Sequence, residues 1–227
     1  MDIRCVLLDL DGTLVDTWNL YLECYLRTLE PYAGRRLTFD ELRALHPTSE
    51  LGAFSRAVPA ERVAEAHADF LRYYRLLHAE LCGGVYPGVA EALAALRAGG
   101  LTVGLVTGKS HGAWAITRDL LSLGDFAVFV GDEDVSEPKP SPEGLTLAIE
   151  RLGVEPEQAV YVGDSVNDAK AARDAGLRFV AALWAKSRDE LPGFLERVRA
   201  ERVWAEVSEP AELVTLVNGR RSAPGTG

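Results

Sequence analysis

Short apolar runs recur along the chain, separated by segments in which apolar residues follow a helical spacing. The runs are rich in β-branched side chains and occupy residues 3–8, 101–106, 126–130, 159–162 and 179–183. Between them, residues 89–96 and 145–152 carry apolar side chains at intervals of three and four, which predicts amphipathic helices. Because strands alternate with helices, we predict an α/β fold in which helices cover both faces of a parallel sheet.

A long segment separates the first apolar run from the second. Roughly 70 residues lie between positions 16 and 85, which is too many for an ordinary connection between strands. Apolar residues follow a helical spacing through most of this segment, which predicts an inserted helical subdomain. We therefore expect a core built from residues 1–15 and 86–218 and a helical subdomain over residues 16–85. Residues 219–227 lack apolar anchors, and we expect them to be disordered.

Length and charge narrow the class of protein. The 227 residues and 24.6 kDa suffice for one large domain or for one domain with a substantial insertion. The chain has 24 Lys and Arg residues against 34 Asp and Glu residues, a formal net charge of -10. It therefore lacks the positive surface that binding to nucleic-acid phosphates requires, and a small-molecule partner is favoured.

Neither a membrane anchor nor a disulfide framework is expected. No stretch of about 18 apolar residues occurs, and the first residues lack a basic segment followed by an apolar run, so we expect no membrane span and no export signal. Cys5, Cys24 and Cys82 form no pair at metal-ligand spacing, which predicts three reduced thiols. We accordingly expect a cytoplasmic protein that is a monomer or a homodimer.

Two acidic residues stand directly after the first apolar run. Asp9 and Asp11 are two residues apart, so they point to the same side of an extended chain. Two carboxylates about 4 Å apart repel by about 4 kcal/mol at an effective dielectric constant of about 20, so the pair requires a shared proton, a metal ion or good solvation. Gly12 permits a sharp turn beside an ion. Taken alone, the segment is equally compatible with an ordinary Asp-Gly turn.

Three further segments place polar groups at predicted strand ends or in a rigid loop. Thr107 and Gly108 follow the second apolar run with a hydroxyl and free amides, which suit phosphate oxygens. Lys139 lies between prolines, which indicates a positioned ammonium group. Asp164 follows the fourth run and Asp168 lies four residues later, a spacing that lets both face one ion. Because ligands of open α/β sheets bind at strand ends, the sequence predicts one site there.

Four motifs together resemble those of the haloacid dehalogenase superfamily, in its phosphatase branch with a helical cap inserted after the first motif. They read DLDGT at 9–13, VTG at 106–108, EPKP at 137–140 and GDSVND at 163–168. The resemblance covers nearly the whole chain. It implies a hydrolase with a Rossmann-like α/β core, residues 16–85 as the cap, and phosphatase activity that depends on Mg²⁺.

The resemblance implies catalytic and phosphate-binding roles for five residues. Asp9 would attack phosphorus and form an aspartyl-phosphate, which divides one difficult displacement into two easier ones. Asp11 would protonate the leaving oxygen and then accept a proton from the water that hydrolyses this intermediate. Thr107 and the Gly108 amide would bind phosphoryl oxygens, and Lys139 would offset the charge of the transferred group.

The resemblance also implies a set of metal ligands. Magnesium would bind to the Asp9 carboxylate, to the Asp11 backbone carbonyl and to Asp164. Asp168 would orient this site through a water molecule or a hydrogen bond.

Several residues separate the reactions known in this superfamily. Dehalogenation is disfavoured because dehalogenases lack the second aspartate of the first motif, which is Asp11 here. Phosphonate hydrolysis is disfavoured because residues 15–86 contain no lysine to form a Schiff base. A phosphohexose mutase, whose cap normally supplies an Arg and Lys pair, and a non-catalytic binding protein remain as alternatives.

The substrate is expected to contact the cap. Residues 46–52 resemble the cap loop that faces the site in phosphoglycolate phosphatases and in relatives that cleave pyrophosphate. Arg43, His46 and Arg56 are the candidate cap contacts, since an arginine can pair with a substrate carboxylate or a second phosphate. Arginines on a helix also commonly form a solvated face. Phosphoglycolate is the first substrate predicted, with pyrophosphate and sugar phosphates as alternatives.

Overall fold

Six parallel strands form the central sheet of the computed structural model, which describes residues 2–45 and 49–219. In spatial order they are β5 (Phe129–Val130), β4 (Thr102–Val106), β1 (Cys5–Leu8), β6 (Ala159–Gly163), β7 (Arg178–Ala182) and β8 (Val203–Val207). β1 lies inside the sheet and pairs in register with both neighbours, so that Leu8 faces Leu105 of β4 and Val162 of β6. The predicted α/β fold with a parallel sheet is confirmed.

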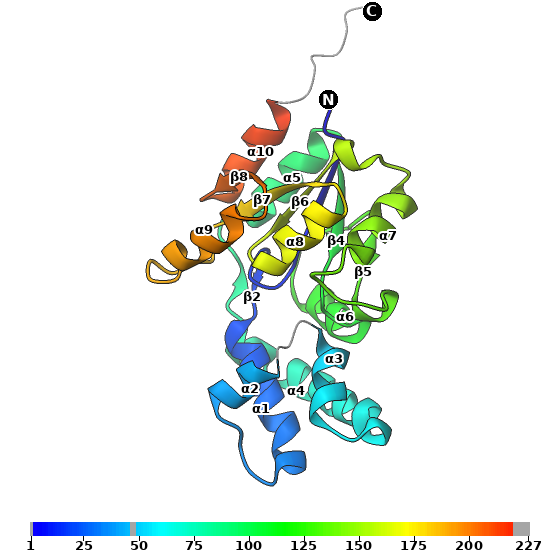
Figure 1. Cartoon of the computed structure of the whole chain (residues 1–227), viewed down its shortest axis with the longest axis vertical. Coiled ribbons are helices and arrows are strands. Elements are labelled where there is room, and N and C mark those ends of the chain that lie inside the picture. The colour runs from blue at the N-terminus through cyan, green and yellow to red at the C-terminus, as the bar shows by residue number, and fades with distance from the viewer. Residues whose placement is uncertain (1, 46–48, 220–227) are drawn as a thin grey trace, which may run out of the picture.

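Helices cover both faces of this sheet (Figure 1). α5 (Val89–Ala98) and α10 (Pro210–Asn218) pack on one face, and α7 (Glu143–Leu152), α8 (Val166–Asp174) and α9 (Leu191–Arg199) pack on the other. Alternate side chains of β1 point to opposite faces of the sheet. Val6 and Leu8 join the core under α5 and α10, whereas Cys5 and Leu7 join the core on the opposite side. Burial on both faces explains why the strands are uninterrupted apolar runs.

A group of helices lies between two short strands outside the main sheet. The chain leaves through β2 (Val15–Asp16) and returns through β3 (Gly84–Val85), and these strands pair antiparallel. Residues 17–83, here called the helical insertion, contain α1 (Trp18–Ala33), α2 (Phe39–Ala44), α3 (Glu50–Ala57), a 3-10 helix (Ala60–Arg62) and α4 (Val63–Leu81). The core of this insertion includes Ala113 and Ile116 of α6 (His111–Leu120). The helical insertion thus packs on the rest of the chain through α6 (Figure 1).

Two edge segments differ from the prediction. The run at residues 126–130 is a strand only at Phe129–Val130. Backbone hydrogen bonds to β4 nevertheless begin earlier, since the Ala127 amide donates to the Val103 carbonyl oxygen and the Val128 carbonyl oxygen accepts from the Leu105 amide. The pattern predicts no strand at β8, since this edge strand mixes half-buried residues with an exposed glutamate.

The remaining described elements are two 3-10 helices, Asp132–Asp134 and Pro156–Gln158. Of the predicted tail, residues 220–227 lie outside the described residues. No helix in the part of the chain that the structure describes has the length and apolar character needed to cross a membrane.

Candidate active site

The four sequence motifs meet at the carboxyl edge of the sheet. Asp9 follows β1, Thr107 follows β4 and Asp164 comes directly after β6. These strands are adjacent and in register, so their ends lie side by side, and the Asp9 amide donates to the Val162 carbonyl oxygen at 2.9 Å. Lys139 reaches the same place from the loop between β5 and α7. Strand order therefore brings distant residues together, as in other open α/β sheets.

Two buried carboxylates and one half-buried carboxylate form the acidic centre of the site. Oxygens of Asp9, Asp164 and Asp168 lie within 4.8 Å of one another. Burial raises the pKa of Asp9 to about 7, and the neighbouring carboxylates add to this rise against the opposing charge of Lys139. Burial also raises the pKa of Asp164. A cation placed among these carboxylates would favour their ionised forms.

The space beside Asp164 suits a small divalent cation. Gly12 has a left-handed backbone conformation, with φ 80°, and a Cβ atom there would lie 2.6 Å from Asp164 Oδ2. The glycine therefore keeps the space next to this carboxylate open. Carboxylate and carbonyl oxygens are the ligands that Mg²⁺ prefers, so the donors present here fit a divalent metal.

Lys139 joins two of the carboxylates. Its Nζ lies 2.8 Å from Asp9 Oδ1 and 2.6 Å from Asp168 Oδ1, and it donates to the Tyr161 hydroxyl at 2.9 Å. Asp168 Oδ2 accepts from the Ser165 amide and hydroxyl at 3.0 and 2.6 Å. Burial by itself would raise the pKa of Asp168, but the charge of Lys139 and these hydrogen bonds outweigh burial and lower the pKa. Asp168 is thus an ionised carboxylate that holds the Lys139 ammonium group against Asp9.

Two further lysines contact the remaining motif aspartates. Lys186 Nζ lies 2.6 Å from Asp164 Oδ2, and Lys109 Nζ lies 3.1 Å from Asp11 Oδ1. The chain has only four lysines, and three of them contact these aspartates. Sequence reasoning misses Lys186 because it lies 22 residues after Asp164 with no motif around it.

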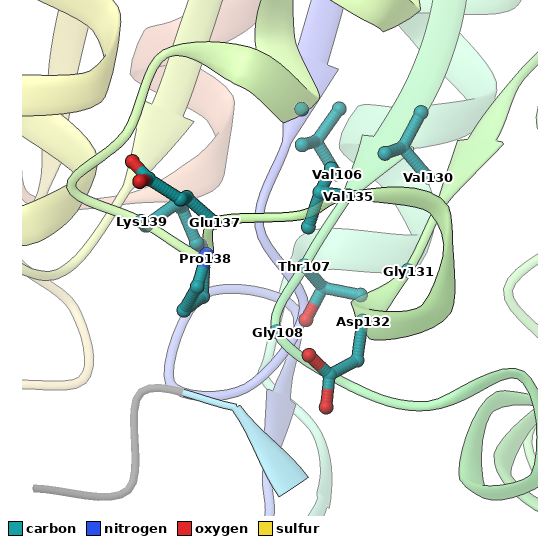
Figure 2. A pocket seen from close by; sticks show the side chains of 11 residues that line it. Val106, Thr107, Gly108, Val130, Gly131, Asp132, Val135, Glu137, Pro138 and Lys139 are labelled. Atoms are coloured by element: carbon teal, nitrogen blue, oxygen red, sulfur yellow. The ribbon is translucent and has the colours of Figure 1, made fainter. Parts of the chain in front are cut away.

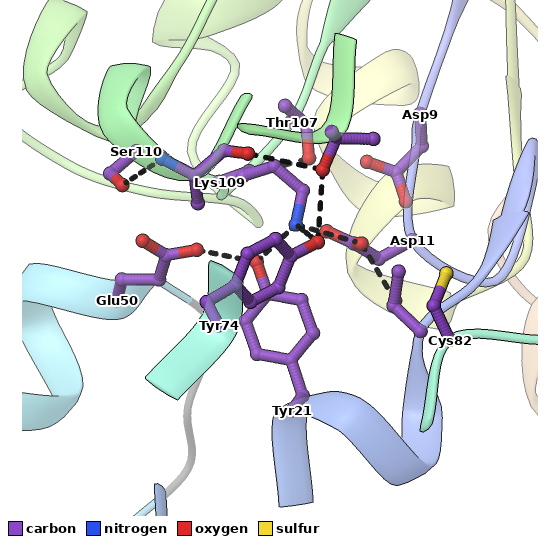
Figure 3. A network of polar contacts seen from close by, with 12 residues as sticks. Asp9, Asp11, Tyr21, Glu50, Tyr74, Cys82, Thr107, Lys109 and Ser110 are labelled. Atoms are coloured by element: carbon purple, nitrogen blue, oxygen red, sulfur yellow. Dashed lines mark hydrogen bonds and ion pairs between the residues drawn. The ribbon is translucent and has the colours of Figure 1, made fainter. Parts of the chain in front are cut away.

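The Asp11 carboxyl is oriented away from the acidic centre. Its Oδ1 pairs with Lys109 (Figure 3). The same oxygen accepts from the Thr17 hydroxyl at 2.7 Å. The sequence places the carboxyls of Asp9 and Asp11 on the same side of the chain. In the structure their repulsion is relieved because each carboxylate has its own lysine. The resemblance assigns only the Asp11 backbone carbonyl to the metal, and this orientation leaves that assignment in place.

A small pocket lies beside the acidic centre. It is lined by Val106, Thr107, Gly108, Val130, Gly131, Asp132, Val135, Glu137, Pro138, Lys139 and Gly144. Figure 2 shows Thr107 and Gly108 between the segment of Glu137 and the loop of Asp132. The Thr107 hydroxyl accepts from the Lys109 amide at 3.3 Å, so its hydrogen is available to a phosphoryl oxygen. The pocket therefore brings the Thr107 hydroxyl and the Lys139 side chain to one wall near Asp9.

The helical insertion contacts the site through the first turn of α3. Glu50 is fully buried there, and it accepts a hydrogen bond from the Tyr21 hydroxyl of α1. The Leu51 amide donates to Asp132 Oδ2, in the wall of the pocket, at 2.7 Å. Sequence reasoning places residues 46–52 near the site but singles out neither Glu50 nor Tyr21, because a buried polar pair between two helices leaves no local pattern.

Two of the three candidate cap contacts fall within the described residues. Arg43 is exposed on α2. Arg56 is exposed on α3, where its Nε donates to the Leu45 carbonyl oxygen at 2.8 Å. His46 lies outside the described residues. The role of these residues in substrate binding stays a prediction.

Known proteins are similar to this chain in both sequence and fold. A family model of haloacid dehalogenase-like hydrolases matches residues 6–182. The phosphoglycolate phosphatase of Salmonella typhimurium is 38% identical over 200 residues, covering 77% of this chain and 79% of its own. The pyrophosphatase PpaX of Bacillus velezensis is 32% identical over 183 residues, covering 80% of this chain and 84% of its own.

The fold of this chain is also similar to that of a protein with a solved structure. CbbY from Rhodobacter sphaeroides in complex with phosphate superimposes with a TM-score of 0.76 at 26% identity, covering 93% of this chain and 96% of its own. The fold, the four motifs and the phosphatase relatives lead to one assignment. The chain belongs to the haloacid dehalogenase-like hydrolases and is a phosphatase of that family.

Proposed function

We propose that the protein is a Mg²⁺-dependent phosphatase of a small phosphorylated metabolite, that it works through an aspartyl-phosphate on Asp9, and that phosphoglycolate is its first candidate substrate. One observation carries the proposal. The buried Asp9 carboxylate lies next to the Lys139 ammonium group and close to two further carboxylates, beside a pocket lined by Thr107 and Gly108. This arrangement suits attack on a phosphoryl group whose oxygens are held and whose charge is offset.

The metal would be held by Asp9, Asp164 and the Asp11 backbone carbonyl. A bound Mg²⁺ would supply positive charge to the carboxylates and to the phosphoryl oxygens. Asp168 would remain with Lys139, because both of its oxygens already accept hydrogen bonds from protein groups.

The chain's own residues would carry out two displacements. In the first, an Asp9 oxygen forms a bond to phosphorus while the bond from phosphorus to the leaving oxygen breaks, and Asp11 gives a proton to that oxygen. In the second, water attacks the aspartyl-phosphate, Asp11 takes a proton from the water, and Asp9 is released with phosphate. Thr107 and Gly108 would hold the phosphoryl oxygens in both steps, and Lys139 would offset their charge.

The helical insertion would act as the cap of this site, over a core of residues 1–15 and 86–218. Its contact with the pocket through Leu51 and Asp132 supports this role. Closure of such a segment excludes water and supplies contacts to the leaving group. The three cysteines are unpaired, which suits a reducing compartment, and we propose a cytoplasmic location.

Pyrophosphate is the second candidate substrate, because PpaX relatives are named as pyrophosphatases. Phosphoglycolate ranks first because the phosphoglycolate phosphatases have the higher identity to this chain, at 38%.

Phosphate release tests the proposal. Wild-type protein and Asp9→Asn would be compared on phosphoglycolate, pyrophosphate, sugar phosphates and nucleotides, with Mg²⁺ and with a chelator. We expect release that requires Mg²⁺ and disappears in the variant, whose folding is checked by its circular dichroism. Release that persists in Asp9→Asn would refute the covalent mechanism. Loss of a sugar phosphate without matching phosphate release would instead indicate a mutase.

A further inference from the structure

A buried lysine next to the second motif connects Asp11 to the helical insertion. The Lys109 side chain has 0% exposure. Its Nζ lies 3.1 Å from Asp11 Oδ1, 2.6 Å from the Tyr21 hydroxyl and 2.9 Å from the Tyr74 hydroxyl (Figure 3). An ammonium group has three hydrogens to donate, so this arrangement uses all of them. A buried charge without partners is strongly unfavourable, so Lys109 depends on all three contacts.

These partners come from two different parts of the fold. The aspartate follows β1, whereas Tyr21 and Tyr74 belong to α1 and α4 of the helical insertion. Both tyrosines are held in turn. The Tyr21 hydroxyl donates to Glu50 of α3, and the Tyr74 hydroxyl lies 2.9 Å from the Thr117 hydroxyl of α6. Movement of the helical insertion away from the sheet would therefore remove two of the three partners of Lys109.

Asp11 is held through one of its two oxygens. Oδ1 accepts from Lys109 and also from the Thr17 hydroxyl at 2.7 Å. Thr17 is the first residue of the helical insertion, directly before α1. Neither contact involves Oδ2, so Oδ2 is the oxygen that these contacts leave to exchange a proton with a leaving group or a water molecule.

We propose that Lys109 is a positioning residue that makes the orientation of the Asp11 carboxyl depend on the packing of the helical insertion against the sheet. The proposal rests on the proposed function, in which Asp11 transfers a proton. While Tyr21 and Tyr74 hold the ammonium group, it holds Oδ1 and fixes the direction of Oδ2. When the helical insertion moves away, the ammonium group loses these partners and Asp11 loses its fixed orientation. Proton transfer is thereby tied to the packed arrangement.

Lys109→Met tests this idea, because methionine has a similar length and no charge. The kcat should fall by about 100-fold, the loss expected when a catalytic group is misplaced. The KM should change by less than about threefold, because Lys109 is buried and acts on a step after binding. Lys170→Met is the matched control, since Lys170 has no ion pair with a motif aspartate within the described residues, and both constants should stay at the wild-type values.

A double-mutant cycle separates positioning of Asp11 from a general structural effect. In an Asp11→Asn background, Lys109→Met should lower turnover of an aryl phosphate by less than about twofold, because Lys109 acts through Asp11. An equal loss in both backgrounds would overturn the proposal. A raised KM with unchanged kcat would also overturn it, since Lys109 would then be a substrate contact.

Hydrogen exchange provides a readout that does not depend on turnover. Lys109→Met should exchange faster than Lys170→Met at the amides of α1 and α4 near Tyr21 and Tyr74. Unchanged exchange in both helices would overturn the coupling, whatever the kinetics show. If the wild-type protein releases no phosphate from any substrate, the proposed function fails, and this exchange comparison still decides whether Lys109 links the helical insertion to the sheet.

Discussion

Replacing Lys186 with methionine should destabilise the metal-free protein and leave the Mg²⁺-bound protein nearly as stable as wild type. Lys186 Nζ and Asp164 Oδ2 lie 2.6 Å apart, and the two side chains retain 20% and 14% exposure. Asp164 also belongs to the group of carboxylates proposed to hold the metal. Without the lysine, this carboxylate stays close to Asp9 and Asp168, and an added cation can replace the lost charge.

The size of the effect follows from the burial of this pair. Removing one partner of a buried ion pair costs about 3–5 kcal/mol, and the lower figure applies because Lys186 and Asp164 keep some exposure. In a chain of this length, 1 kcal/mol changes the Tm by about 2–4 °C, so the Tm in chelator should fall by about 6–12 °C. Saturating Mg²⁺ should reduce the loss to less than about 1 kcal/mol, because the metal stabilises the folded state to which it binds.

Thermal unfolding in chelator and along a Mg²⁺ titration is the assay. The increase in Tm caused by Mg²⁺ should be larger for Lys186→Met than for wild type. Lys170→Met controls for loss of a lysine elsewhere and should match wild type in both conditions. A loss of stability of the same size with and without Mg²⁺ would contradict this prediction, because Lys186 and the metal would then not substitute for each other at Asp164.

Two further predictions concern Asp9 and Lys139. The pKa of Asp9 in the folded protein, about 7, is above its ordinary value of 3.8, so the folded state binds more protons and loses stability as pH rises from about 4 to about 7. Urea unfolding in chelator should show this contribution in wild type but not in Asp9→Asn, and identical pH profiles would contradict it. Tyr161→Phe removes the hydroxyl that lies 2.9 Å from Lys139 Nζ and donates to the Val106 carbonyl, so it should lower the free energy of unfolding by about 1 kcal/mol. It should also lower kcat by about tenfold by loosening Lys139, and an unchanged kcat would show that Asp168 alone suffices to position this lysine.

Local patterns are enough to predict the central strands and the places where the motifs occur. The central strands are recognisable because both of their faces are buried, which excludes polar side chains along their length. Polar residues return where the two-sided core ends, as at Asp9 after β1 and Asp164 after β6. The positions of the candidate site residues are therefore local properties of the sequence.

Local patterns do not predict which residues these site residues contact. Lys186 meets Asp164 and Lys109 meets Asp11 only because neighbouring segments of the fold converge at one edge of the sheet. The helical spacing of apolar residues predicts that Tyr74 is buried in the helical insertion, but it does not predict that the Tyr74 hydroxyl contacts Lys109.

Local patterns thus predict which polar groups follow the strands, but the pairing of each lysine with its carboxylate depends on the folded arrangement. The free energy of a buried charge pair depends on the distance between its atoms and on their removal from water. Both quantities are set by strand order and by the packing of the helical insertion on α6, which join residues that are far apart along the chain.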